Sequence, residues 1–223
     1  MPLHWAASGG HADVVKHLLD LGVPTDNKDD AQWTPLMIAA SAGKDAIVSM
    51  LISLGADVNT TNDGGQTPLH YAASRKRYEI AELLLQNGAH IDAQDKTSAA
   101  TPLHRAASRG HSKIVKLLLK HNANCDIQDA EGNTALYVSC FTAPLLPWNY
   151  GLVADVSTRQ HQLADDVKAN KESHMACEED RAEIAVTLVE NGATLSIENK
   201  MKMPPVELAN KGLARQLIRL NDS

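Results

Sequence analysis

The fold of this chain is decided by the stretch TPLHYAAS at residues 67–74, which recurs in altered form along most of the sequence. Its second position marks the register, because the same slot falls at Pro2, Pro35, Pro68, Pro102, Ala135 and Pro205. The steps between these residues are 33, 33, 34, 33 and 70, and the last step equals 33 plus 37. The chain is therefore a repeat array in which one repeat carries an insertion of 37 residues.

The start of each repeat carries the signals of a short helix. Thr34, Thr67 and Thr101 stand where an N-cap hydroxyl accepts a bond from an orphan backbone N–H, and the following proline suits the first turn. The end of this inner helix is predicted at glycines that suit a left-handed conformation, namely Gly10, Gly43 and Gly110.

A second helix follows in each repeat. Apolar residues at helical spacing predict outer helices over 14–19, 47–51, 80–85, 114–119 and 184–189. Four of them end at Gly22, Gly55, Gly88 and Gly192, and Asn122 takes that slot in the fourth. This period and motif resemble the ankyrin repeat, a β-turn finger followed by two antiparallel helices. We therefore expect an all-α ankyrin-repeat solenoid of stacked helix-turn-helix units with β-turn fingers.

The composition agrees with a solenoid and excludes several classes of protein. The chain is 43% hydrophobic but only 4% aromatic, so its core is expected to consist of aliphatic side chains between helices. A net charge of −6 and a pI of about 5.9 argue against a general nucleic-acid binder. The sequence has no apolar run of about 18 residues and no signal-peptide pattern. We expect a monomer in the cytoplasm and nucleus, with no membrane contact.

No catalytic or metal-binding motif stands out. The motif histidines His4, His70 and His104 are expected to brace backbone groups between repeats. Cys125, Cys140 and Cys177 have no paired spacing, and His174 with Cys177 is only half of a zinc site. Because phosphate-loop, hydrolase and zinc-protease signatures are also absent, we predict a non-enzyme without cofactor or metal.

The insertion divides the chain into three parts: ankyrin repeats over 1–140 with an incomplete first repeat, an irregular insertion over 141–176, and C-terminal repeats with a cap over 177–223. Cys140 and Cys177 occupy the same repeat position, so residues 134–140 and 173–179 compete to be one inner helix. We expect both segments to be helical, with the second beside its outer helix. The fourth finger is one residue long, and Ala99 replaces its turn glycine.

Several stretches are more specific than the ankyrin pattern. They are LGVP at 21–24, KDDAQWTPL at 28–36, IAASAG at 38–43, IQDAEGNT at 127–134 and IENK at 197–200. Together with TPLHYAAS at 67–74, they resemble the gankyrin family, ankyrin-repeat subunits that accompany the proteasome regulatory particle. The resemblance covers residues 1–140 and 177–223. It implies a non-catalytic chaperone of regulatory-particle assembly that binds the C-terminal domain of a regulatory ATPase subunit through its concave face.

The same resemblance implies further partners: a cyclin-dependent kinase, the retinoblastoma protein and a ubiquitin ligase. In the family a Leu-x-Cys-x-Glu segment serves retinoblastoma binding, but VSCFT at 138–142 and MACEE at 175–179 both lack the leucine. We therefore place that partner in doubt.

The alternative function is a generic ankyrin adaptor with a different protein partner. A third reading makes the chain a hydroxylation substrate at Asn59, whose spacing from Leu51 suits such enzymes.

Charged residues predict where a partner binds. Finger tips are expected to form an acidic rim of Asp29, Asp30, Asp63, Asp95, Asp129 and Glu131, and inner-helix ends a basic floor of Arg75, Lys76, Arg77, Arg105 and Arg109. Such a two-sign surface suits a folded protein with the opposite pattern. Trp5, Trp33 and Tyr71 are candidate anchors, because aromatic residues and arginine dominate binding energies. The predicted partner-binding residues are Asp30, Trp33, Asp63, Tyr71, Arg75, Arg77, Arg105 and Arg109.

The sequence opens in the middle of a repeat, so the family's N-terminal cap and first finger are absent from it. We expect a frayed end here, with Leu3 and Trp5 more exposed than their counterparts in other repeats.

Overall fold

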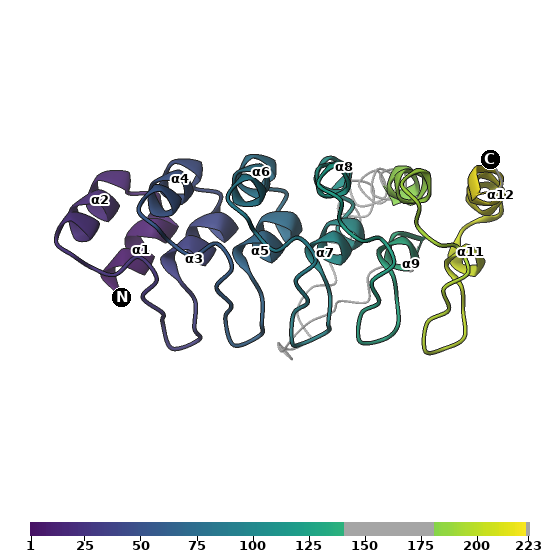
Figure 1. Ribbon diagram of the computed structural model, residues 1–223, viewed down its shortest axis with the longest axis horizontal. Helices are drawn as coiled ribbons and strands as arrows, with labels where there is room; N and C mark the ends of the chain where they lie inside the picture. Colours follow the sequence, from purple (N-terminus) through teal and green to yellow (C-terminus); the bar gives the residue numbers. More distant parts are fainter. Residues whose placement is uncertain (141–180, 222–223) are drawn as a thin grey trace, which may run out of the picture.

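The computed structural model describes residues 1–140 and 181–221, in which every regular element is a helix. The helices form two rows along the array (Figure 1). The inner row contains α1 (Pro2–Gly9), α3 (Pro35–Ala42), α5 (Pro68–Ser74), α7 (Pro102–Ser108), α9 (Ala135–Cys140) and α11 (Pro205–Leu208). The outer row contains α2 (Ala12–Asp20), α4 (Asp45–Ser53), α6 (Tyr78–Gln86), α8 (Ser112–Lys120), a helix over 181–190 and α12 (Lys211–Asn221).

Fingers project from one side of the inner row, as predicted for an ankyrin solenoid (Figure 1). Each finger turns through one residue with positive φ, namely Gln32, Gly65, Ala99, Gly132 or Lys202. In the long fourth finger, Ala99 takes this position with φ of 49°, and the Asp95 N–H donates to Ala100 O at 3.0 Å. The fourth finger is therefore one residue longer than the others, but a backbone hydrogen bond still closes it. None of the described helices is long and apolar enough to span a membrane.

The predicted caps Thr34 and Thr101 accept the expected backbone N–H groups, from Met37 at 3.3 Å and from His104 at 3.4 Å. The Thr67 hydroxyl lies 2.9 Å from Nδ1 of His70 at the start of α5. At the other end, Gly10, Gly43 and Gly110 adopt left-handed φ angles of 85°, 75° and 73°. The inner helices therefore begin and end where the local sequence places them.

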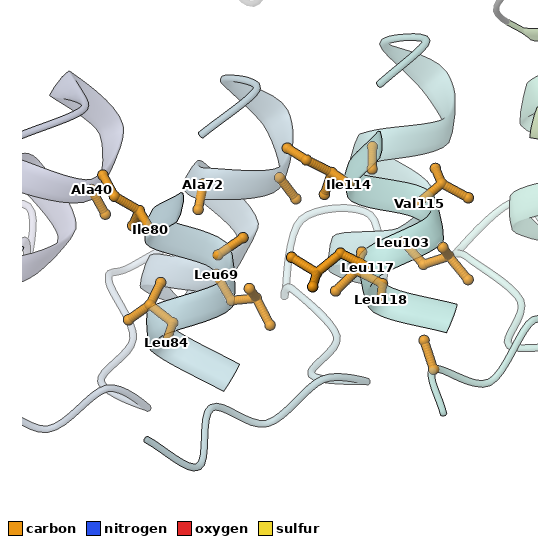
Figure 2. Close-up of a cluster of buried hydrophobic side chains, with 14 of the residues drawn as sticks. Ala40, Leu69, Ala72, Ile80, Leu84, Leu103, Ile114, Val115, Leu117 and Leu118 are labelled. Carbon is orange, nitrogen blue, oxygen red and sulfur yellow. The ribbon is translucent and has the colours of Figure 1, made fainter. Parts of the chain in front are cut away.

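The core is a continuous strip between the two rows. The motif leucines Leu36, Leu69, Leu103 and Leu136 have exposed fractions of 0%, and the small alanines after them are also buried. Outer helices add isoleucines and valines from the opposite side, as Figure 2 shows for Ile80, Ile114 and Val115 around Leu69 and Leu103. Because each buried leucine contributes about 1.5 to 3 kcal/mol, this strip holds the array together.

The motif histidines join neighbouring repeats, as expected. Nε2 of His4, His70 and His104 each lies 3.0 Å from a backbone oxygen in the next repeat, on Trp33, Ala100 and Asn133 respectively. On the other ring nitrogen, Nδ1 of His70 accepts from the Thr67 N–H at 3.1 Å. One side chain thus ties its own helix start to the following finger.

A second contact between repeats had no signal in our sequence interpretation. The residue before an outer helix reaches back to the C-terminus of the preceding repeat's inner helix. Arg77 donates to Ala42 O at 3.3 Å, and Nε2 of His111 lies 3.2 Å from Ser74 O. Such contacts satisfy free carbonyls at the C-terminus of a helix, and the charge of Arg77 also complements the helix dipole.

One repeat is assembled from segments on both sides of residues 141–180. α9 takes the inner position between α7 and α11, and the helix over 181–190 takes the outer position after α8 (Figure 1). Lys116 on α8 pairs with Glu183 at 2.5 Å. Among the described residues, 134–140 therefore provide the inner helix. The competing segment 173–179 and the insertion predicted over 141–176 lie outside the described residues.

The expectation about the first repeat is half right. Trp5 is 77% exposed, as predicted, whereas its counterparts Ile38, Tyr71 and Arg105 are partly buried. Leu3 is 2% exposed, against 0% for Leu36, Leu69 and Leu103, so it is buried like its counterparts and the prediction of greater exposure is wrong for Leu3. The physical reason is that Leu3 belongs to the core cluster between the rows, where α2 and α3 pack against α1.

Candidate protein-binding face

The structure gathers several of the predicted residues on one side of the inner row. We call this surface the inner-helix face and define it by Trp33, Tyr71, Arg75, Arg105 and Arg109. Tyr71 and Arg75 lie four residues apart on α5 and its C-cap, and Arg105 and Arg109 repeat this spacing on α7. Residues at this spacing share one side of a helix. Two neighbouring repeats therefore present the same arrangement side by side.

An aromatic pair lies at one end of this face. The rings of Trp33 and Tyr71 have centroids 4.3 Å apart and planes tilted by 36°, and both residues are partly exposed. The Tyr71 hydroxyl accepts from Asn62 Nδ2 at 2.8 Å and donates to Gln66 Oε1. Burial raises the pKa of the Tyr71 hydroxyl. These contacts hold the pair in place before a partner arrives, which lowers the entropy cost of binding.

Arg105 is held by an acidic residue of its own repeat. Its guanidinium donates to Asp95 Oδ2 at 2.5 Å and to Ser98 Oγ at 3.1 Å. Burial opposes ionisation of Asp95, but the hydrogen bonds from Arg105 and Ser98 outweigh it and lower the pKa of this carboxyl. The Arg105 side chain keeps 31% exposure, whereas that of Asp95 has none. Arg105 is thus fixed in orientation and still reachable from solvent.

The predicted acidic rim needs correction. Asp95 does not lie on it, because its side chain is buried against Arg105. Asp29 and Asp129 are also engaged, since their carboxylates accept finger N–H groups, including those of Trp33 at 2.8 Å and Asn133 at 2.8 Å. An aspartate that opens a turn commonly makes such bonds. The exposed acidic residues of the predicted rim are Asp30, Asp63 and Glu131.

The predicted basic residues separate into two groups. Arg75 and Arg109 are exposed C-caps of α5 and α7, and Lys76 is exposed in a left-handed conformation with φ of 59°. Arg77 is partly buried because it contacts the preceding repeat through Ala42. The structure therefore brings Arg75, Arg105 and Arg109 to the inner-helix face and turns Arg77 towards the repeat before it.

Cys125, Cys140 and Asn59, which the sequence analysis named, all make contacts within the fold. Burial raises the pKa values of the Cys125 and Cys140 thiols to about 11. Cys140 is 1% exposed within α9, so its thiol offers little surface to a partner. Asn59 bonds to the next repeat through Gly88 O at 3.0 Å and the His90 N–H at 2.7 Å. In residues 1–140 and 181–221, no group of three metal-ligating side chains comes together.

The motif histidines predict a loss of stability in mild acid. Burial lowers the pKa values of His70 and His104, so below about pH 6.5 the unfolded chain binds protons that the folded chain does not. The free energy of unfolding therefore has its full value above about pH 6.5. It falls as the pH drops towards the pKa values that His70 and His104 have in the folded state. We expect urea denaturation to show a lower midpoint at pH 5.5 than at pH 7.5.

The control is the double variant His70→Met and His104→Met, because Met37 occupies the same motif position in α3. This variant is expected to be less stable at pH 7.5 and to change less between the two pH values. An unchanged pH dependence would show that other groups carry it.

Family models identify the class of protein. A model described as ankyrin repeats (3 copies) matches residues 3–95, and one described as ankyrin repeats (many copies) matches residues 84–137. The two-row helical array with its fingers agrees with both (Figure 1). Residues 3–137 are therefore ankyrin repeats, a class of solenoid whose curved surface suits the binding of other proteins.

Among curated proteins, the chain is similar to the 26S proteasome non-ATPase regulatory subunit 10 of human, mouse and rat. Each comparison gives 61% identity over 33 residues, which is 15% of this chain. The aligned part spans 15% of the human protein and 14% of the mouse and rat proteins. A match of 33 residues equals the length of one repeat. It therefore relates this chain to the proteasome subunit over a small part of either protein.

Proposed function

We propose that this chain is a non-catalytic scaffold that assists assembly of the proteasome regulatory particle by binding the C-terminal domain of a regulatory ATPase subunit. The observation that carries the proposal is the 61% identity over one repeat length with a non-ATPase regulatory subunit of the 26S proteasome. We place the protein in the cytoplasm and nucleus, and cell fractionation would test this location.

The proposed contact surface is the inner-helix face together with Asp30 and Asp63 on the neighbouring fingers. An aromatic pair flanked by arginines supplies the residue types that dominate binding energy. Exposed charges of both signs select a partner by complementarity and accelerate the encounter. Arg105 contributes an oriented guanidinium, because Asp95 holds it. Arg77 is not part of this surface, because it joins its own repeat to the preceding one through Ala42 O.

Charge reversal on this surface is expected to weaken binding. We expect Arg75→Glu and Asp30→Arg each to reduce affinity for the ATPase C-terminal domain about tenfold, with a further loss at higher salt. Isothermal titration calorimetry with the purified domain at two salt concentrations measures both effects. Matched controls are Arg215→Glu on α12 and Asp20→Arg on α2, which reverse exposed charges away from the face. Equal binding by all four variants would remove the inner-helix face as the contact surface.

The second candidate function is an ankyrin adaptor with a partner outside the proteasome. The observation that favours it is the short match, because 85% of this chain lies outside the aligned 33 residues. A pull-down from cell lysate separates the two functions. Recovery of regulatory ATPase subunits supports the first, and recovery of other proteins without proteasome subunits supports the second.

A further inference from the structure

The sequence has three places where an aspartate or asparagine directly precedes a glycine: Asp63–Gly64, Asn87–Gly88 and Asn191–Gly192. At such a pair the glycine nitrogen can attack the side-chain carbonyl carbon of the residue before it, because no Cβ on the glycine hinders the approach. The aspartate or asparagine is exposed in all three pairs. Exposure therefore does not distinguish them, and their hydrogen bonds decide which pair can react.

The two asparagine pairs are held by the C-terminal ends of outer helices. Nδ2 of Asn87 donates to Leu83 O at 2.8 Å. The Gly88 N–H donates to Leu85 O at 3.1 Å. The pair Asn191–Gly192 makes the equivalent bonds at 2.7 and 3.0 Å. In both pairs the side-chain amide and the glycine nitrogen are bound to helix carbonyls, so neither group is free to approach the other.

The pair Asp63–Gly64 lies at the tip of a finger and has neither restraint. In residues 1–140 and 181–221, the Asp63 carboxylate makes no hydrogen bond or ion pair, and the Gly64 N–H donates to no acceptor. Asp63 is exposed and Gly64 is partly exposed, so water reaches both. The attacking nitrogen and the carbon that it attacks are therefore free only in this pair.

The free Gly64 nitrogen is a departure from the other fingers. The N–H at this finger position donates to the side chain two residues earlier, as Ala31 does to Asp29 at 3.0 Å. The same bond is 2.9 Å long in two later fingers, where the donors are Glu131 and Met201. In the finger of Gly64 the matching acceptor is Asn62 Oδ1, and it accepts only from the Gln66 N–H, at 3.0 Å. The bond that would hold the nitrogen is therefore missing.

We propose that Asp63 is a site of spontaneous isomerisation to isoaspartate. The Gly64 nitrogen attacks Cγ of the protonated Asp63 carboxyl, a bond forms between N and Cγ, and the carboxyl OH leaves as water with the proton of the N–H. Water then opens the five-membered imide. When it cleaves the bond between the nitrogen and the main-chain carbonyl carbon of Asp63, the chain continues through Cγ and the former main-chain carbonyl becomes a free carboxylate. One water is released and one is taken up, so the mass does not change.

Isomerisation would alter the contact between two fingers. The Gly65 N–H donates to Asn62 O at 2.9 Å across the turn, and Gly64 O accepts from the Lys96 N–H of the next finger at 2.8 Å. The product has one more main-chain atom between Asn62 and Gly65, so both bonds lose their geometry. The negative charge also moves to a different carbon of residue 63. Isomerisation therefore changes the tip of this finger without changing the net charge of the chain.

Ageing the full chain for several weeks at pH 7.5 tests this proposal. Peptide mapping with electron-transfer fragmentation distinguishes isoaspartate from aspartate, and deamidation of asparagine adds mass. We expect isoaspartate to accumulate at Asp63 in the folded chain, while Asn87 and Asn191 stay intact. In urea, where the restraints are lost, all three sites should react. Deamidation of either asparagine before isomerisation of Asp63 in the folded chain, or no isoaspartate at Asp63, would overturn the proposal.

The matched control variant is Gly64→Ala, because Ala31 occupies the same position in another finger. The added Cβ would lie 3.3 Å from Thr97 Oγ1, and this exposed side chain can move away. We expect isoaspartate to form about tenfold more slowly in this variant, because the Cβ crowds the attacking nitrogen. An unchanged rate would contradict attack by that nitrogen.

Hydrogen exchange provides a second measurement on the aged chain. The Lys96 amide should exchange faster in the isomerised fraction than in the fresh protein, while amides within α6 keep their protection. Unchanged exchange at Lys96 would contradict the described effect on the fingers. Both measurements use the chain alone, so their result does not depend on whether it binds an ATPase domain.

Discussion

Replacing Leu103 by alanine is expected to lower the free energy of unfolding by about 3 kcal/mol. Leu103 is 0% exposed on α7, which packs between α5 and α9 in the middle of the array. Truncation removes buried apolar surface and leaves a cavity, because helices on both sides hold the space open. Urea denaturation followed by circular dichroism measures the change.

The control for this prediction is Leu54→Ala, because Leu54 follows α4 with 52% of its surface exposed. The free energy of unfolding of the Leu54→Ala variant is expected to fall by no more than about 0.5 kcal/mol. Since contacts in a solenoid run between neighbouring repeats, hydrogen exchange should show weakened protection first in α5, α7 and α9 of the Leu103→Ala variant. Equal losses for Leu103→Ala and Leu54→Ala would contradict the continuous core described above.

Removing the Asp95 carboxylate is expected to have the next largest effect. The Asp95→Ala variant should lose about 2 to 3 kcal/mol of its free energy of unfolding. The carboxylate accepts from the Ser98 N–H at 2.8 Å and from Arg105 at 2.5 Å. Without it, a backbone donor of the fourth finger and a partly buried guanidinium lose their acceptor. Thermal and urea denaturation at pH 7.5 measure the loss.

Two further variants isolate the cause. Asp63→Ala removes an exposed finger carboxylate with no hydrogen bond of its own among the described residues, and it should cost less than about 0.5 kcal/mol. Asp95→Asn should recover part of the stability, because Asn62 at the same position of the preceding finger accepts from Gln66 N–H at 3.0 Å. If Asp95→Ala were as stable as Asp63→Ala, the Asp95–Arg105 pair would have no structural role.

The Asp95–Arg105 pair also links stability to the proposed function. Arg105 lies on the inner-helix face and owes its orientation to Asp95. A variant that keeps the arginine but removes the aspartate therefore separates the charge of Arg105 from its position. Orientation matters for a guanidinium because its donors form a planar fork that must meet the acceptor in register.

Much of the fold follows from short segments of sequence. The threonine before each inner helix and the glycine after it act through the backbone groups of their own turn, so helix ends such as those of α3 could be predicted. The buried position of Leu36 follows from helical periodicity in the same way. Asp30, Arg75 and Arg109 were also predicted to be accessible on the surface, and they are exposed. Their role in binding stays a prediction.

Other features depend on which segments meet in space, and these the sequence by itself did not determine. Asp95 was predicted on the same acidic rim as Asp30, but the fold buries its side chain against Arg105, ten residues later. Leu3 is buried because α2 and α3 cover it. Local signals determine where helices begin and end, because they act within one turn. The pairing of charges and the covering of apolar faces were decided by tertiary structure, since they require groups that only folding brings together.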